Sequence, residues 1–134
     1  YLVQARTVAA DEPGFVFLRS RLTRGAGPAG NVPPDGSAYL ARSPGTAHTW
    51  DNVVVLDSVV GPHVAGNGWL AQPKPNPAQS RADAGWREYR NRTPDGRPVS
   101  FGGYVLNEQE AKRYASRAAV FAGYSGGKGW SPQP

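Results

Sequence analysis

The 134-residue sequence contains no cysteine, which excludes both a disulfide framework and a thiolate metal site. Its only histidines, His48 and His63, lie far apart in the sequence and have no ligand-like cluster around them. We therefore expect no bound metal and no zinc-dependent chemistry.

Long apolar runs and methionine are also absent. No stretch approaches the roughly 20 apolar residues that span a bilayer, so we expect no membrane span. No signal peptide is recognisable at the N-terminus. Because the chain starts with Tyr1 inside a strand-like pattern, we expect it to be a piece of a longer protein.

Glycine and proline are abundant, at 17 and 13 residues, which favours turns over long helices. The apolar run from Phe15 to Leu18 is repeated from Val53 to Leu56, where β-branched residues are densest. The separation is 53 − 15 = 38 positions, and Ser20 and Ser58 share it. Tyr1 and Leu2 recur at the same distance, as Tyr-Leu at 39–40. This pattern indicates a repeated structural unit.

Short strands are predicted at 1–7, 14–23, 37–42, from 51 onward and at 86–90. A short helix is predicted at 108–117, with Asn107 as its N-cap and Glu110 completing a capping box. Residues 72–80, with three prolines, are read as an extended surface excursion. The whole predicts one all-β domain of stacked parallel coils at 1–69, followed at 70–134 by a closing strand, a capping helix and a loop-rich tail.

The net charge of +5 is carried by the second half of the chain. Residues 1–69 hold five basic and five acidic side chains, whereas residues 70–134 hold ten and five. Such an excess favours anionic partners, although it is equally typical of a solvated face.

Six segments, taken together, resemble the C-terminal half of a pectinesterase. This family has a right-handed parallel β-helix and removes methyl esters from pectin. Segment 39–42, Tyr-Leu-Ala-Arg, resembles the family's Leu-Gly-Arg-Pro-Trp motif. The others are 14–18, 53–69, 86–89, 106–111 and 130–132, in the family's order.

The resemblance implies a metal-free and cofactor-free ester hydrolysis by two aspartates, one nucleophilic and one acting as acid and base. Glutamines stabilise the oxyanion, and an arginine orients the nucleophile. Only the arginine falls in this chain, as Arg42; the aspartates are expected upstream of Tyr1. The chain alone is therefore expected to be inactive. The implied partners are pectin or polygalacturonate and the N-terminal part of the β-helix, and the implied location is secreted, periplasmic or cell-envelope.

The chain departs from the motif after Arg42, where Ser-Pro replaces the family's Pro-Trp. Trp50 is the candidate replacement for the tryptophan that lines the sugar groove. His63 is expected to be a structural loop residue, Asp51 a turn residue and Asp57 an outward, solvated side chain.

Two functions from different classes stay open. The first is a pectinesterase-like esterase portion that uses Arg42 and Trp50. The second is a non-catalytic module that binds acidic glycans through its basic surface. The run 86–97 mixes basic and aromatic residues as nucleic-acid-binding segments do. It also matches the family's closing strand, so we do not expect nucleic-acid binding.

Overall fold

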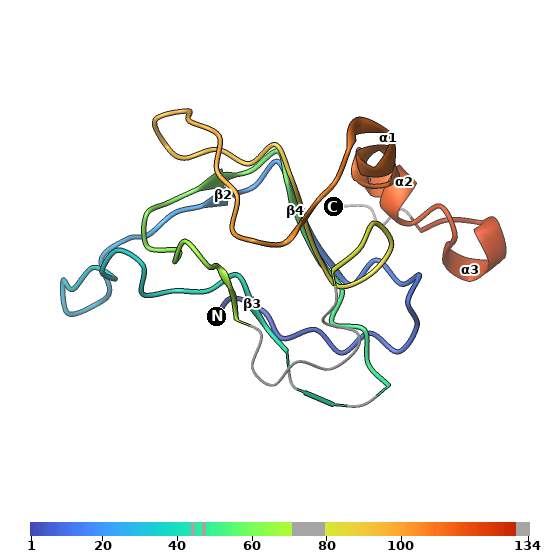
Figure 1. Ribbon diagram of the computed structural model, residues 1–134, viewed down its shortest axis with the longest axis horizontal. Coiled ribbons are helices and arrows are strands. Elements are labelled where there is room, and N and C mark those ends of the chain that lie inside the picture. Colours follow the sequence, from blue (N-terminus) through green and yellow to red (C-terminus); the bar gives the residue numbers. More distant parts are fainter. Residues whose placement is uncertain (44, 47, 71–79, 131–134) are drawn as a thin grey trace.

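The chain folds mainly into short strands, followed by a few short helices (Figure 1). The computed structural model describes residues 1–43, 45–46, 48–70 and 80–130. Most of the predicted excursion at 72–80, and the end of the tail, lie outside these residues. The elements are β1 (Phe15–Leu18), β2 (Arg21–Leu22), β3 (Ala41–Arg42), β4 (Val53–Leu56), β5 (Val59–Val60), β6 (Trp69–Leu70), β7 (Trp86–Tyr89), β8 (Tyr104–Val105), α1 (Glu108–Ala111), the 3₁₀ helix η2 (Lys112–Tyr114), α2 (Arg117–Val120) and α3 (Tyr124–Gly127). The prediction of an all-β chain is confirmed.

The strands form three small sheets in which every strand pair is parallel. The largest has the order β1-β4-β7-β8, and the others pair β2 with β5 and β3 with β6. Phe15 lies opposite Val53, and Arg21 lies opposite Val59. Both pairs are 38 positions apart (53 − 15 and 59 − 21), so the repeat seen in the sequence is the distance between paired strands.

Two predicted strands are much shorter than expected. Segment 1–7 contributes a single bridge, from Val3 to Ala41, and segment 37–42 contributes β3 and a bridge at Ala38. Each segment has only a brief apolar stretch, and pairing is confined to it. The backbone N–H of Leu2 donates to the carbonyl of Tyr39 at 2.9 Å, and the next rung follows at Val3.

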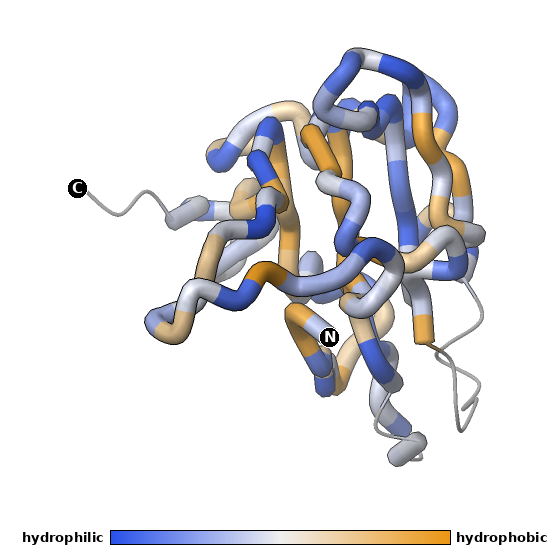
Figure 2. Tube along the Cα trace, turned by 90° about the vertical axis from the view of Figure 1, so that its left-hand side faces the viewer, coloured by the Kyte–Doolittle hydropathy of each residue, from blue (hydrophilic) through white to orange (hydrophobic). Residues whose placement is uncertain are grey.

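The core lies on both faces of β4, whose four residues are all buried. Val53 and Val55 point to one side, where Trp69, Trp86 and Phe101 also pack. The alternate residues, Val54 and Leu56, point to the other side, under Leu106, Ala111 and Tyr114. In Figure 2 apolar residues gather along parts of the stacked strands, between polar and neutral segments. A strand buried on both faces accounts for its unbroken apolar sequence.

α1, η2 and α2 pack against one face of the large sheet, whereas α3 lies farther out (Figure 1). The predicted capping box is present, since Asn107 accepts from the N–H of Glu110 and the Glu110 carboxylate accepts from the N–H of Asn107. The helix is more broken than predicted: α1 ends at Ala111, and η2 continues it to Tyr114. Ala111 and Tyr114 are buried, whereas Ala115, which follows the end of η2, is exposed. No helix among the described residues is long and apolar enough to cross a membrane.

Asn52 fastens the N-terminal loop to the coil that begins at β4. Its side-chain amide donates to the carbonyls of Ala10 and Glu12, at 3.0 and 2.8 Å, and its oxygen accepts from the N–H of Gly85 at 2.8 Å. Gly14 passes so close that a Cβ there would lie 2.0 Å from the carbonyl oxygen of Asn52. Glycine at 14 is therefore a steric requirement of this stacking.

Candidate functional site

Arg42 is presented on the outer side of a short strand. Its neighbour Ala41 is fully buried, and successive side chains of a strand point to opposite faces, so the Arg42 side chain faces solvent. The backbone N–H of Arg42 donates to the carbonyl of Val3 at 3.1 Å, and Leu70 lies opposite it in the register. The guanidinium carbon is 5.8 Å from the centre of the Tyr1 ring. The strand is thus held from both sides while its cation stays accessible.

A buried hydrogen bond joins Ser43 to Asp51, the residues that directly follow the predicted site residues Arg42 and Trp50. Ser43 follows Arg42, Asp51 follows Trp50, and the Ser43 hydroxyl donates to Asp51 Oδ2 at 2.7 Å. Both Ser43 and Asp51 are fully buried. The bond closes the loop between them, so the structure places Arg42 and Trp50 at the two ends of one closed loop. The spacing of Arg42 and Trp50 in the sequence does not reveal this closure.

Asp51, predicted to be a turn residue, lies in an irregular loop outside any assigned turn, and its carboxyl is in an unusual environment. Its backbone has φ = +43°, a left-handed conformation. The Oδ1 atom is buried and has no hydrogen-bond partner. Burial raises the pKa of Asp51 above its ordinary value, while hydrogen bonds from Ser43 and Thr49 and the charge of Arg6 oppose the rise. The loop therefore contains a carboxyl that resists ionisation.

Trp50 lies half-buried beside this loop, with a cation over its ring. The Arg81 guanidinium carbon is 5.1 Å from the centre of the ring, and the Trp50 backbone N–H donates to the carbonyl of Thr7 at 2.8 Å. An indole under an arginine can pack a sugar ring at its edge while the cation pairs with a carboxylate. Arg42 and Arg81 thus bring two cations and an aromatic ring to the same loop.

The other residues weighed from the sequence lie apart from this loop. His63 is buried, and its carbonyl accepts from the N–H of Ala38 at 2.8 Å. Asp57 is half-buried rather than fully solvated, because Arg90 Nε approaches its Oδ1 at 3.2 Å. Among the described residues, no hydrogen bond, ion pair or ring contact joins either side chain to Arg42 or Trp50.

Two charged residues of β7 are buried, which the basic composition of the segment did not indicate. The Glu88 carboxylate accepts from the backbone N–H groups of Phe101 and Gly103, at 3.0 and 2.8 Å, and from the Ser100 hydroxyl at 2.9 Å. Arg87 is fully buried and donates to the Tyr114 hydroxyl. The alternation of Trp, Arg, Glu and Tyr predicted a strand correctly but gave no sign that Arg87 and Glu88 are inside.

No group of three or more histidine or acidic side chains that could hold a metal ion is found in the part of the chain that the structure describes. Comparison of the chain with family models, with curated proteins and with solved structures returns no match.

Proposed function

We propose that the chain is the C-terminal part of a right-handed parallel β-helix of the pectinesterase type, in a secreted or cell-envelope esterase. The observation that supports this proposal most is the position of Arg42. It is an exposed cation on the two-residue strand β3, and the loop that follows β3 is closed by the Ser43–Asp51 hydrogen bond. In this proposal Arg42 orients a carboxylate nucleophile supplied by an upstream segment, because a weak carboxylate nucleophile must be held and paired.

The pairing of the strands supports the β-helix. Val3 and Ala41, Phe15 and Val53, and Arg21 and Val59 pair in three different sheets, and each pair is 38 positions apart. Equal offsets in all three sheets are what a coil of constant length produces. From the second coil to the third, Val53 pairs with Trp86 and Val59 with Arg92, and both pairs are 33 positions apart. The sequence distance between paired strands is therefore shorter by the same amount in these two sheets.

The exposed apolar residues support an upstream coil as a partner. Four large hydrophobic side chains of the first coil, Tyr1, Leu2, Val8 and Phe15, are 45 to 74 % exposed. Among the described residues, β1 forms the edge of the large sheet and pairs with β4 alone. An open edge beside exposed apolar side chains favours addition of another parallel strand.

The experiment measures binding of methyl-esterified oligogalacturonate to the 134-residue chain by calorimetry, together with methanol release. We expect binding without methanol release, because the nucleophile belongs to the upstream segment. Arg42→Ala should weaken binding about tenfold, the typical loss of one charge-assisted hydrogen bond. Arg24→Ala is the matched control, since Arg24 pairs with Asp35 in the 23–36 loop.

Methanol release by the chain alone would contradict the assignment of the nucleophile to another segment. Equal affinities for Arg42→Ala and the unaltered chain would contradict a contact between Arg42 and the substrate. The second candidate function, a glycan-binding module without esterase chemistry, is favoured by Arg81 over the Trp50 ring. It predicts equal or tighter binding of the fully de-esterified oligomer, because only carboxylates would then be recognised.

A further inference from the structure

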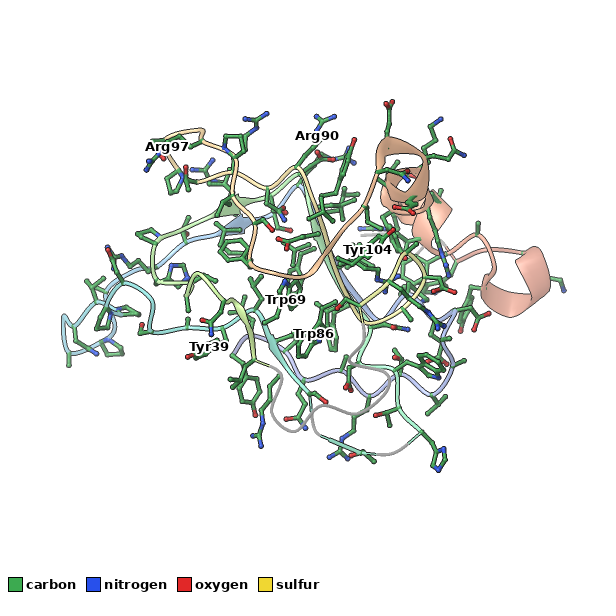
Figure 3. All side chains as sticks on the ribbon, in the orientation of Figure 1. Tyr39, Trp69, Trp86, Arg90, Arg97 and Tyr104 are labelled. Atoms are coloured by element: carbon green, nitrogen blue, oxygen red, sulfur yellow. The ribbon has the colours of Figure 1, made fainter. Side chains whose placement is uncertain are left out.

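We propose that a second surface of the chain, separate from Arg42, binds a carboxylated polysaccharide. It consists of Arg19, Arg21, Arg90 and Arg92 around Asp57, and we call it the arginine corner. It lies at the turns that follow β1, β4 and β7. Arg90 is seen at the upper rim of the molecule in Figure 3, and β3, which carries Arg42, lies lower in the same orientation in Figure 1. The arginine corner is therefore separate from the Arg42 surface.

Successive coils stack the arginine corner into two columns. Arg19, Asp57 and Arg90 follow the last paired residues of β1, β4 and β7, whose register places them one above another. In the second column Arg21 pairs with Val59, and Val59 bridges to Arg92. Parallel strands are about 4.8 Å apart, so the two arginines of each column are about 10 Å apart.

The charge of the arginine corner is strongly positive and accessible. Four arginines against one aspartate leave three positive charges. Each of the four arginines is exposed, and Asp57 pairs with Arg90 alone, at 3.2 Å. The guanidinium groups of Arg19 and Arg92 donate to the carbonyls of Ala115 and Gly96, at 3.4 and 3.0 Å, whereas the Arg21 side chain has no hydrogen-bond or ion-pair partner among the described residues. A hollow of about 380 Å³ is lined by Arg19, Asp57, Ser58, Val59, Arg90 and Arg92.

The backbone of the corner indicates that its arginines serve more than the turn. Arg19, Asp57 and Arg90 all have left-handed backbones, with φ of +48°, +49° and +49°. Glycine and asparagine adopt this conformation at least cost, and aspartate tolerates it well. Arginine does so with strain, yet it occupies two of the three positions. Strained residues of this kind concentrate at binding sites.

The chemistry of the corner favours a carboxylated polysaccharide over a nucleic acid. Guanidinium groups bind carboxylates through paired N–H donors, and phosphates equally well. Asp57, between the arginines, can only accept hydrogen bonds when ionised. A sugar polymer supplies hydroxyl donors between its carboxylates, whereas a DNA backbone would set a phosphate charge against Asp57. The partner that satisfies both groups carries spaced carboxylates and hydroxyls.

The test uses Arg19→Asn together with Arg90→Asn, because asparagine accepts the left-handed conformation and keeps the turn. Binding of fluorescent polygalacturonate oligomers to the 134-residue chain is measured by anisotropy at several salt concentrations. We expect salt-sensitive binding to the unaltered chain and about a tenfold loss in the double variant. Its melting temperature should be unchanged or higher.

The matched control is Arg24→Gln with Lys128→Gln, which removes the same charge elsewhere and should keep the affinity. Equal losses in the two double variants would overturn the proposal, because net charge would then explain the binding. Displacement of the polymer by a DNA oligonucleotide of equal length at lower concentration would also overturn it, in favour of a nucleic acid. The Arg19→Asn, Arg90→Asn variant should bind a fully methyl-esterified oligogalacturonate as the unaltered chain does, because that oligomer has no free carboxylate. Failure of the corner and failure of the esterase proposal are therefore separately visible.

Discussion

Asp51 combines three features that each cost free energy: a left-handed backbone, a buried carboxyl and an oxygen without a partner. Such combinations persist where the surroundings impose them. Here the Ser43 hydroxyl holds one carboxyl oxygen, and the loop between the two residues begins beside Arg42. The strain therefore belongs to the same loop as the candidate site.

The stability of the chain should depend on the protonation of Asp51. Burial raises the pKa of Asp51 above its ordinary value of 3.8, so the folded chain keeps this proton to higher pH than the unfolded chain. The stability from this carboxyl is fully present below 3.8 and is lost as the pH rises through the raised value. Asp51→Asn never ionises and still offers Ser43 an acceptor. We therefore expect its stability relative to the unaltered chain to grow with pH across this window.

Urea denaturation at a series of pH values measures this difference. Asp11→Asn, at an exposed carboxyl, reports the general effect of removing one negative charge. If the free energy of unfolding depends on pH in the same way for Asp51→Asn and the unaltered chain, the protonation of Asp51 has no effect on stability.

At the scale of elements, the C-terminal helices are joined to the large sheet through Arg87 and Tyr114. Arg87 on β7 donates to the hydroxyl of Tyr114 on η2, and its guanidinium carbon is 5.3 Å from the centre of that ring. The Nε and Nη2 atoms of Arg87 are buried without partners, and burial lowers the pKa of this side chain. A buried cation without a carboxylate adds little net stability.

Replacing each partner should have opposite consequences. Arg87→Met has a similar length and removes the unpartnered groups, so we expect the free energy of unfolding to stay within about 1 kcal/mol or to rise. Tyr114→Phe leaves a further N–H of Arg87 unpartnered and should cost about 1–3 kcal/mol. Urea denaturation measures both, and the double variant should recover most of the loss. A larger loss in Arg87→Met than in Tyr114→Phe would show that the cation itself is stabilising.

The elements differ in how well the sequence predicts them. β1, β4, β7 and the capping box at Asn107 were predictable because each rests on a local pattern: apolar β-branched runs, alternation, or a polar pair three residues apart. β3 and β6 have two residues each, too few for any periodicity. The Ser43–Asp51 bond and the burial of Arg87 depend on contacts between coils, which no local pattern encodes.

For the whole molecule, the open edge at β1 should govern self-association. Phe15 is 48 % exposed on this edge strand, beside the apolar side chains of the first coil. Edges of this kind pair with other chains unless a charge prevents it. Phe15→Lys should therefore shift the chain toward monomer in sedimentation velocity at high concentration.

Val105→Lys is the matched control, because Val105 is exposed on β8 at the opposite end of the same sheet. Dissociation by Val105→Lys alone would place the associating edge at β8. A chain that stays monomeric without either substitution would contradict the prediction.

Trp69 and Trp86 stack inside the coil, with ring centres 5.7 Å apart and planes within 11° (Figure 3). They come from β6 and β7, in different sheets, so the two rings meet only when the last coil has closed. Indoles this close and nearly parallel couple their electronic transitions, and isolated ones do not. We expect the near-ultraviolet circular dichroism of this pair to change when the last coil opens, so the chain carries its own optical marker of coil closure.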